Sequence, residues 1–249
     1  MNPFARPRLI ELHEQPRTPP AIRQPVQDML TFAWTHRVWP LQHTSPAVLA
    51  GTVLERVLAT IAQGGADKVA VVDFCSGAGG PIPTIERVVN AHRAAKSLPA
   101  TPFILTDLHP HTSAWSHLRH SAKALDYVPH PVDATRAERE LVGVAGKADD
   151  ANKHFRTFFL AFHHFDERGA QAVLRDAMEN ADGIGIFELQ EFNLGSLLIK
   201  YLAERAEKQL EAQGKRPTGG RSWVWEQGRE AHTMGIGKMY YIVGRRADV

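Results

Sequence analysis

The chain is poor in cysteine and has no long apolar run. Its 249 residues include a single cysteine, Cys75, which excludes an internal disulfide framework and suits a reducing compartment. No segment approaches the roughly 20 apolar residues that a membrane span needs. Residues 1–20 are broken by prolines and charges, unlike a secretion signal. We therefore expect a cytoplasmic protein without a membrane partner.

The chain also lacks a large excess of charge of either sign. The 29 basic and 27 acidic residues leave a formal net charge of +2, which gives no strong field for attracting nucleic acid. Hydrophobic residues make up 43% and charged residues 22%, close to the average for globular domains. We expect a folded protein with a small-molecule partner and no nucleic-acid partner, and a homodimer stays open as its assembly.

Short apolar runs alternate with helical patterns after residue 66, which predicts an α/β fold with a mostly parallel sheet and helices on both faces. The last two runs are too close together for a parallel crossover, so they predict an antiparallel pair. Residues 1–66 are expected to form an N-terminal arm and helical lid, and residues 67–249 the main domain. Within the lid, apolar spacing predicts one helix from Ala21 and another that begins at Ser45-Pro46.

The expected secondary structure of the main domain can be given by residue ranges. Seven strands are predicted at Lys68–Phe74, Phe103–Asp107, Leu125–Val132, Phe155–Phe162, Gly183–Leu189, Trp223–Glu230 and Lys238–Gly244. Helices are predicted between them at Pro83–Ala95, Ser113–Ala124, Arg136–Val142, Glu167–Asn180 and Leu194–Gln213.

A glycine turn follows the first predicted strand, in the sequence VVDFCSGAGG of residues 71–80. Glycines at the carboxyl end of a parallel strand let the backbone approach a nucleoside ligand without a side chain in the way. Asp73 ends this strand and is expected to receive the positively charged end of a ligand, directly or through water. A Gly-X-Gly turn also serves ordinary strand–helix packing, so the turn alone does not decide the ligand.

Dinucleotide and phosphate sites fit the turn less well. Ile82 stands where a dinucleotide fingerprint has its third glycine, and Pro81 removes a backbone donor for a pyrophosphate. None of the Gly-Lys pairs is followed by Ser or Thr, and Gly237-Lys238, followed by Met239, lies far from the turn. An NAD-dependent oxidoreductase is the first alternative, and a non-catalytic nucleoside-binding or scaffold protein is the second.

Two further acids follow the second and third predicted strands. Asp107 ends FILTD, where a carboxylate can accept both hydrogen bonds of a ribose diol. Asp133 in PVDA could accept the exocyclic amine of adenine. An aspartate before a helical pattern is more often an N-cap, and that use stays open for Asp133.

The order VVDFCSGAGG, FILTD, PVDA, FFLAFHHFDE, GIGIFELQE resembles class I S-adenosylmethionine-dependent methyltransferases over roughly Lys68 to Gly244. Within that superfamily, AFHHFDE looks like a pattern of small-molecule methyltransferases. The resemblance implies a Rossmann-like seven-stranded sheet, S-adenosyl-L-methionine as the cofactor, and methyl transfer to oxygen or nitrogen of a small molecule. This chain departs from the family at Cys75, where glycine is usual.

The resemblance also implies a set of cofactor-binding residues. The methionine end is expected around Asp73, Cys75, Ser76, Gly77 and Gly79, the ribose at Asp107 with Leu108, and the adenine near Asp133 with Ala134, while Phe162 completes the set.

His163 and His164 are the candidate catalytic residues. They follow the fourth predicted strand, where the acceptor would bind, and a histidine there could take a proton during transfer. Packing and hydrogen bonding are the alternative use, since proximity alone can catalyse this reaction. Glu188 and Glu191 either line the acceptor site or cap the next helix, and capping is favoured. His109 and His111 lack a familiar ligand spacing, so no metal is expected.

Overall fold

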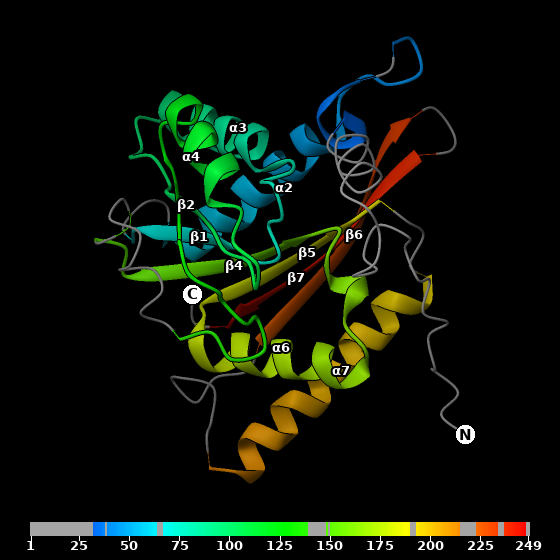
Figure 1. Cartoon of the computed structure of the whole chain (residues 1–249). Coiled ribbons are helices and arrows are strands. Elements are labelled where there is room, and N and C mark those ends of the chain that lie inside the picture. The colour runs from blue at the N-terminus through cyan, green and yellow to red at the C-terminus, as the bar shows by residue number, and fades with distance from the viewer. Residues whose placement is uncertain are drawn as a thin grey trace, which may run out of the picture.

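A seven-stranded sheet runs through the computed structural model of the chain (Figure 1). The strand order is β3-β2-β1-β4-β5-β7-β6, in which β7 runs antiparallel to its neighbours β5 and β6 and the other pairs are parallel. The structure describes residues 32–37, 39–63, 67–138, 148, 150–189, 193–214, 223–233 and 237–247, without the side chains of 193–198 and 200.

The elements lie close to their predicted positions. The strands are β1 (Val69–Asp73), β2 (Phe103–Leu105), β3 (Leu125–Tyr127), β4 (Lys153–Phe159), β5 (Gly183–Glu188), β6 (Trp223–Thr233) and β7 (Gly237–Arg246). The helices are α2 (Pro46–Ile61), α3 (Ile82–Ala95), α4 (Thr112–Ser121), α6 (Glu167–Asn180) and α7 (Asn193–Ala212), with a short 3-10 helix η3 (Phe162–His164).

Both faces of the sheet are covered, as predicted. Helices α2, α3 and α4 lie on one face, and α6 and α7 lie on the other (Figure 1). Side chains alternate along β1, so that Val69 and Val71 join the core under α2 and α3, while Ala70 and Val72 join the core under α6 and α7. Burial on both faces explains why β1 and β2 are almost entirely apolar.

Helix α2 packs against the sheet and α3. Ala50, Leu54 and Leu58 are fully buried in the same cluster as β1 and α3. The division into a lid over residues 1–66 and a main domain over 67–249 stays a prediction. Most of the helix expected from Ala21 lies outside the described residues. Residues 32–35 are described and are helical. None of the described helices is long and apolar enough to cross a membrane.

Three predicted elements differ from the structure. The third strand ends at Tyr127 instead of Val132, because Pro129 and Pro131 cannot donate to a ladder. Of the helix expected over 136–142, residues 136–138 are not helical and the remainder lies outside the described residues. The fourth strand ends at Phe159, after which Leu160 adopts a left-handed φ of 50°.

His163 and His164 are consequently not at the end of a strand. They close η3, in which the His164 N–H donates to the Ala161 carbonyl at 3.2 Å. The turn at Leu160 carries the chain over the carboxyl edge of the sheet, and the Leu160 N–H donates to the Phe187 carbonyl at 3.0 Å. Both histidines therefore lie beside the end of β5.

Candidate ligand-binding site

The loop after β1 has the backbone of a glycine turn. Gly77, Gly79 and Gly80 have φ values of 51°, 103° and 41°, and Cys75 has 57°. A Cβ atom on Gly79 would lie 2.3 Å from Leu118 Cδ1 of α4, and the φ of 103° would strain any other residue at this position. A Cβ atom on Gly77 would meet no atom within 4 Å, which leaves the backbone open to a ligand at that point.

Hydrogen bonds fix this turn to the neighbouring elements. The Ser76 N–H donates to the Thr106 carbonyl at 3.1 Å, beyond the end of β2. The Trp115 Nε1–H of α4 donates to the Gly77 carbonyl at 2.9 Å, and the indole is fully buried. Trp115 was missed at the sequence level, where the only available signal was an indole N–H that must find a partner when buried.

Asp73 lies under the turn rather than on its open side. The residue is 2% exposed, and its carboxylate accepts hydrogen bonds from Ser76 Oγ at 2.6 Å and from Thr157 Oγ1 at 3.0 Å. Burial raises the pKa of Asp73 to about 7, against the effect of these two hydroxyls, and the nearby Asp107 adds to the rise. A contact between Asp73 and a ligand stays a prediction.

Asp107 connects the loop after β1 to the loop after β2 through hydrogen bonds. Its Oδ2 accepts the Gly77 N–H at 2.9 Å, and its Oδ1 accepts the His109 N–H at 2.8 Å. Each oxygen keeps a further lone pair, so these bonds leave acceptor capacity for a ribose. The adjacent Leu108 is 52% exposed at the same edge.

Three acids predicted to meet the ligand surround Cys75. The pKa of the Cys75 thiol is raised to about 12, first by burial and then by the charges of Asp107, Asp73 and Asp133. The fold thus brings the ends of β1, β2 and β3 together as expected from the sequence. The region carries negative charge.

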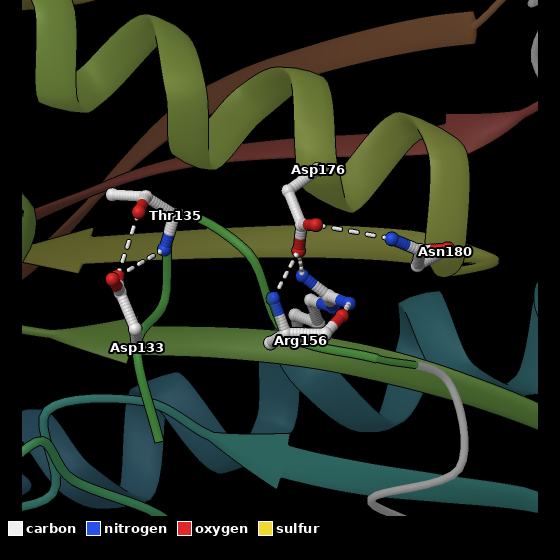
Figure 2. Close-up of polar contacts among 6 residues, drawn as sticks. Asp133, Thr135, Arg156, Asp176 and Asn180 are labelled. Carbon is white, nitrogen blue, oxygen red and sulfur yellow. Dashed lines mark hydrogen bonds and ion pairs between the residues drawn. The ribbon is translucent and has the colours of Figure 1, made fainter. Parts of the chain in front are cut away.

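Asp133 caps a turn in the loop after β3, rather than a helix (Figure 2). Its Oδ1 accepts the Thr135 N–H at 2.9 Å and the Thr135 hydroxyl at 2.7 Å. Partial burial acts to raise the pKa of Asp133, but the bonds from Thr135 and the charge of Arg136 hold it below its usual value. The adjacent Ala134 is buried in the core, as is Phe162 of η3.

A buried ion pair holds the same loop against the sheet (Figure 2). Arg156 of β4 is 1% exposed and contacts Asp176 of α6 through Nη1. Arg156 Nη2 donates to the Ala137 carbonyl at 2.7 Å, and the Ala137 N–H donates to Asp176 Oδ2 at 3.0 Å. The guanidinium also lies 5.1 Å from the ring centroid of Phe74, next to the glycine turn.

The candidate catalytic histidines lie in η3, beside the end of β5. Their ring centroids lie 4.0 Å apart, and the ring planes are tilted by 53°. His163 Nδ1 lies 3.0 Å from Glu188 Oε2, and both side chains are largely buried. Glu188 ends β5 and faces His163, which differs from the helix cap favoured at the sequence level. Glu191 lies outside the described residues.

Within the described part of the chain, no group of three or more His, Cys, Asp or Glu side chains is arranged to hold a metal ion. The absence of a metal site in the whole protein stays a prediction.

The order of the strands, with the antiparallel β7 inserted between β5 and β6, decides the fold. It is Rossmann-like, of the class I methyltransferase type. The prediction of fold class is confirmed. A fold of this type supports many chemistries, so the function rests on the site.

Comparisons with known proteins find only distant similarity. No family model and no curated protein matches the chain. A magnesium protoporphyrin IX methyltransferase from Synechocystis PCC 6803 with bound SAH is 12% identical, with a TM-score of 0.47 over 90% of this chain and 99% of that one. A putative RNA methyltransferase from Pyrococcus horikoshii is 13% identical, with a TM-score of 0.40 over 89% and 96%.

A putative class I S-adenosylmethionine-dependent methyltransferase from Listeria monocytogenes is 11% identical, with a TM-score of 0.47 over 92% of this chain and 68% of that one. At such low identities, the activities of these proteins are not transferred to this chain. Its chemistry is therefore argued from the side chains of its own site.

Proposed function

We propose that this chain is an enzyme that binds S-adenosyl-L-methionine and transfers its methyl group to oxygen or nitrogen of a small molecule. The observation that carries the proposal is the gathering of Asp73, Asp107 and Asp133 around a glycine turn that is open at Gly77. S-adenosylmethionine carries a sulfonium and an ammonium group and no phosphate. Negative charge at the turn attracts such a ligand and repels a pyrophosphate.

The turn itself supports the same choice over NAD. Pro81 has no N–H, and the N–H of Ile82 donates to the Gly79 carbonyl at 3.1 Å. Ile82 is also 1% exposed in the core, where a dinucleotide fingerprint has a glycine. The first backbone donors of α3 are therefore missing or occupied, which is unfavourable for a diphosphate.

In this proposal the cofactor residues divide along the edge of the sheet. Cys75, Ser76, Gly77 and Gly79 hold the methionine end, with Asp73 acting through its hydroxyl partners or water. Asp107 and Leu108 hold the ribose. Asp133, Ala134 and Phe162 shape the adenine end.

When bound, S-adenosylmethionine supplies an electrophilic methyl group. The protein's part is to align the acceptor, exclude water and receive a proton, which His163 and His164 are placed to do. The small net charge supports a small-molecule acceptor without nucleic-acid or membrane partners. Cytoplasmic location and a homodimer are kept as part of the same proposal.

Thermal unfolding with three ligands tests the function. S-adenosylmethionine and S-adenosylhomocysteine should each raise the Tm, by an amount that grows with ligand concentration, while NAD should not. A shift with NAD alone would overturn the proposal, and no shift with any of the three would favour a scaffold.

The ribose assignment has its own variant. Asp107→Ala should weaken S-adenosylhomocysteine at least about tenfold, because a charge-assisted hydrogen bond contributes on the order of 1.5–3 kcal/mol. Asp150→Ala is the matched control, since Asp150 pairs with Lys68 before the start of β1, away from the turn. Calorimetry measures both affinities. Equal affinity of Asp107→Ala and wild type would show that Asp107 does not bind the ribose.

A further inference from the structure

The Arg156–Asp176 ion pair is buried although the burial of charges is costly. Arg156 is 1% exposed and Asp176 is 7% exposed. Two charges taken out of water lose hydration that their mutual attraction often fails to offset, and apolar residues of similar volume commonly leave a fold as stable or more stable. Stability alone therefore does not account for this pair, and its other contacts indicate a second role.

Both members of the pair bond to the backbone of Ala137, in the loop after β3. Arg156 Nη2 donates to the Ala137 carbonyl at 2.7 Å, and the Ala137 N–H donates to Asp176 Oδ2 at 3.0 Å. The other oxygen of Asp176 accepts a hydrogen bond from Asn180 Nδ2 at 3.0 Å, within α6 (Figure 2). The pair therefore fixes both polar backbone groups of Ala137 relative to β4 and α6.

The loop that is held in this way carries Asp133. Residues 133–137 form no helix. The Arg136 N–H donates to the Asp133 carbonyl at 3.1 Å, and Thr135 donates twice to Asp133 Oδ1. These local bonds join Asp133 to the segment that ends at Ala137, so a displacement of Ala137 would move the carboxylate. Its Oδ2 meets only the exposed Arg136 side chain, at 3.3 Å among the described contacts, and in the proposed function it accepts the adenine amine.

Arg156 also contacts the segment that leads into the glycine turn. Its guanidinium carbon lies 5.1 Å from the ring centroid of Phe74, the residue before Cys75. The Phe74 N–H donates to the Thr157 carbonyl at 2.9 Å, next to Arg156 in β4. One side chain therefore contacts the two segments that would hold the methionine end and the adenine end of the ligand.

We propose that Arg156 and Asp176 are positioning residues, which fix the loop after β3 so that Asp133 Oδ2 meets the 6-amino group of adenine. Neither residue contacts the ligand, and both act through Ala137 and Asp133. The pair thereby makes the site selective for adenine among purines. This inference rests on the proposed function and names what sets the base selectivity of that same site.

Amide hydrogen exchange tests the positioning without any ligand. In the double variant Arg156→Leu/Asp176→Leu, which leaves no unpaired charge, the Ala137 amide should exchange at least about tenfold faster than in wild type, because its carboxylate partner is lost. Arg156→Lys keeps the charge but lacks the second nitrogen, and it should change exchange in the same direction. Unchanged exchange at Ala137 in both variants would overturn the proposal.

A second buried pair provides the matched control. Arg246 lies 3.6 Å from Asp182, which precedes β5 at the opposite edge of the sheet from the glycine turn. The double variant Arg246→Leu/Asp182→Leu should leave exchange at Ala137 as it is in wild type. Faster exchange at Ala137 in this control would overturn the proposal, since any buried pair would then have the same effect.

Calorimetry with two ligands tests the selectivity, using S-adenosylhomocysteine and its analogue with hydrogen in place of the 6-amino group. Wild type should bind S-adenosylhomocysteine at least about tenfold more tightly than the analogue, because the amine donates to a carboxylate. Arg156→Leu/Asp176→Leu should reduce this ratio to less than about threefold, as the same bond is lost. The Arg246→Leu/Asp182→Leu control should keep the wild-type ratio. An unchanged ratio in the first variant would overturn the proposal.

The route through Asp133 is tested by combining the variants. Asp133→Ala should show the same low ratio, and adding Arg156→Leu/Asp176→Leu to it should not change the ratio further, because both changes remove one interaction. A further change in the ratio would show that the pair acts by another route and would overturn the proposal.

The two proposals fail separately in these experiments. If the wild-type protein does not bind S-adenosylhomocysteine, the proposed function is wrong and the adenine selectivity falls with it, while exchange at Ala137 still decides whether the pair holds the loop. If S-adenosylhomocysteine binds and the leucine substitutions leave the ratio unchanged, the proposed function stands and only the positioning role is wrong.

Discussion

At the scale of single residues, Cys75 occupies a backbone position that suits glycine. Its φ of 57° lies in the left-handed region, where an L side chain costs roughly 1–2 kcal/mol. The resemblance that motivated the cofactor assignment has glycine at this point of the turn. Cys75 therefore differs from the usual glycine in its side chain, while its backbone keeps the left-handed conformation that suits glycine.

Replacing Cys75 by glycine and by alanine should separate these effects. Both variants remove the thiol, but Cys75→Gly also relieves the left-handed strain, so it should be more stable than Cys75→Ala by about 1 kcal/mol. Urea unfolding measures the difference. An alanine variant as stable as the glycine variant would mean that the turn relaxes to another φ.

At the scale of elements, the Arg156–Asp176 pair joins β4, α6 and the loop after β3 (Figure 2). Asp176→Asn leaves the Arg156 charge buried without a carboxylate, so it should destabilise the fold by about 3–5 kcal/mol. The double variant Arg156→Leu/Asp176→Leu should lose less than the sum of its single variants, because neither charge is left unpaired.

Chemical unfolding checks this prediction, with the exposed pair of Glu167 and Arg205 as the control. Glu167→Gln should change the free energy of unfolding by less than about 1 kcal/mol. Additive effects at Arg156 and Asp176 would show that the two groups do not interact in the folded protein.

The elements also show what could be predicted from the sequence. Apolar runs such as Val69–Val72, buried on both faces, marked the strands, and the short connection between β6 and β7 marked the antiparallel pair. The pairing of Arg156 with Asp176 and of Trp115 with Gly77 depends on contacts across 20 and 38 positions, which periodicity does not encode. The 3-10 turn at His163 likewise depends on the single left-handed residue Leu160.

At the scale of the whole molecule, one buried acid makes stability depend on pH. The folded protein raises the pKa of Asp73 from the ordinary 3.8 to about 7, so the folded state holds this proton more tightly than the unfolded state. Its contribution to the free energy of unfolding is fully present below the unfolded pKa and is lost as the pH rises through 7. The pH window for this effect is therefore about 4 to 7.

Asp73→Asn should remove that dependence. The stability of the variant relative to wild type should rise by about 3 kcal/mol between pH 5 and pH 8, since two pKa units correspond to that energy. Urea unfolding at both pH values gives the difference, in which the other titrating groups cancel. Glu204→Gln, on the exposed face of α7, should show no such change. If the difference in free energy of unfolding between Asp73→Asn and wild type were the same at both pH values, the raised pKa of Asp73 would be contradicted.

The burial of the lone cysteine also makes the protein suitable for site-specific labelling. Thiolate is the form that reacts with maleimide dyes, and a thiol whose pKa is about 12 is almost entirely protonated at neutral pH. A second cysteine at an exposed position, such as His92→Cys near the end of α3, should be labelled at least tenfold faster than Cys75. Mass spectrometry of timed samples would show it. Fluorescent reporters can therefore be placed around the site while the native thiol in the glycine turn stays unmodified.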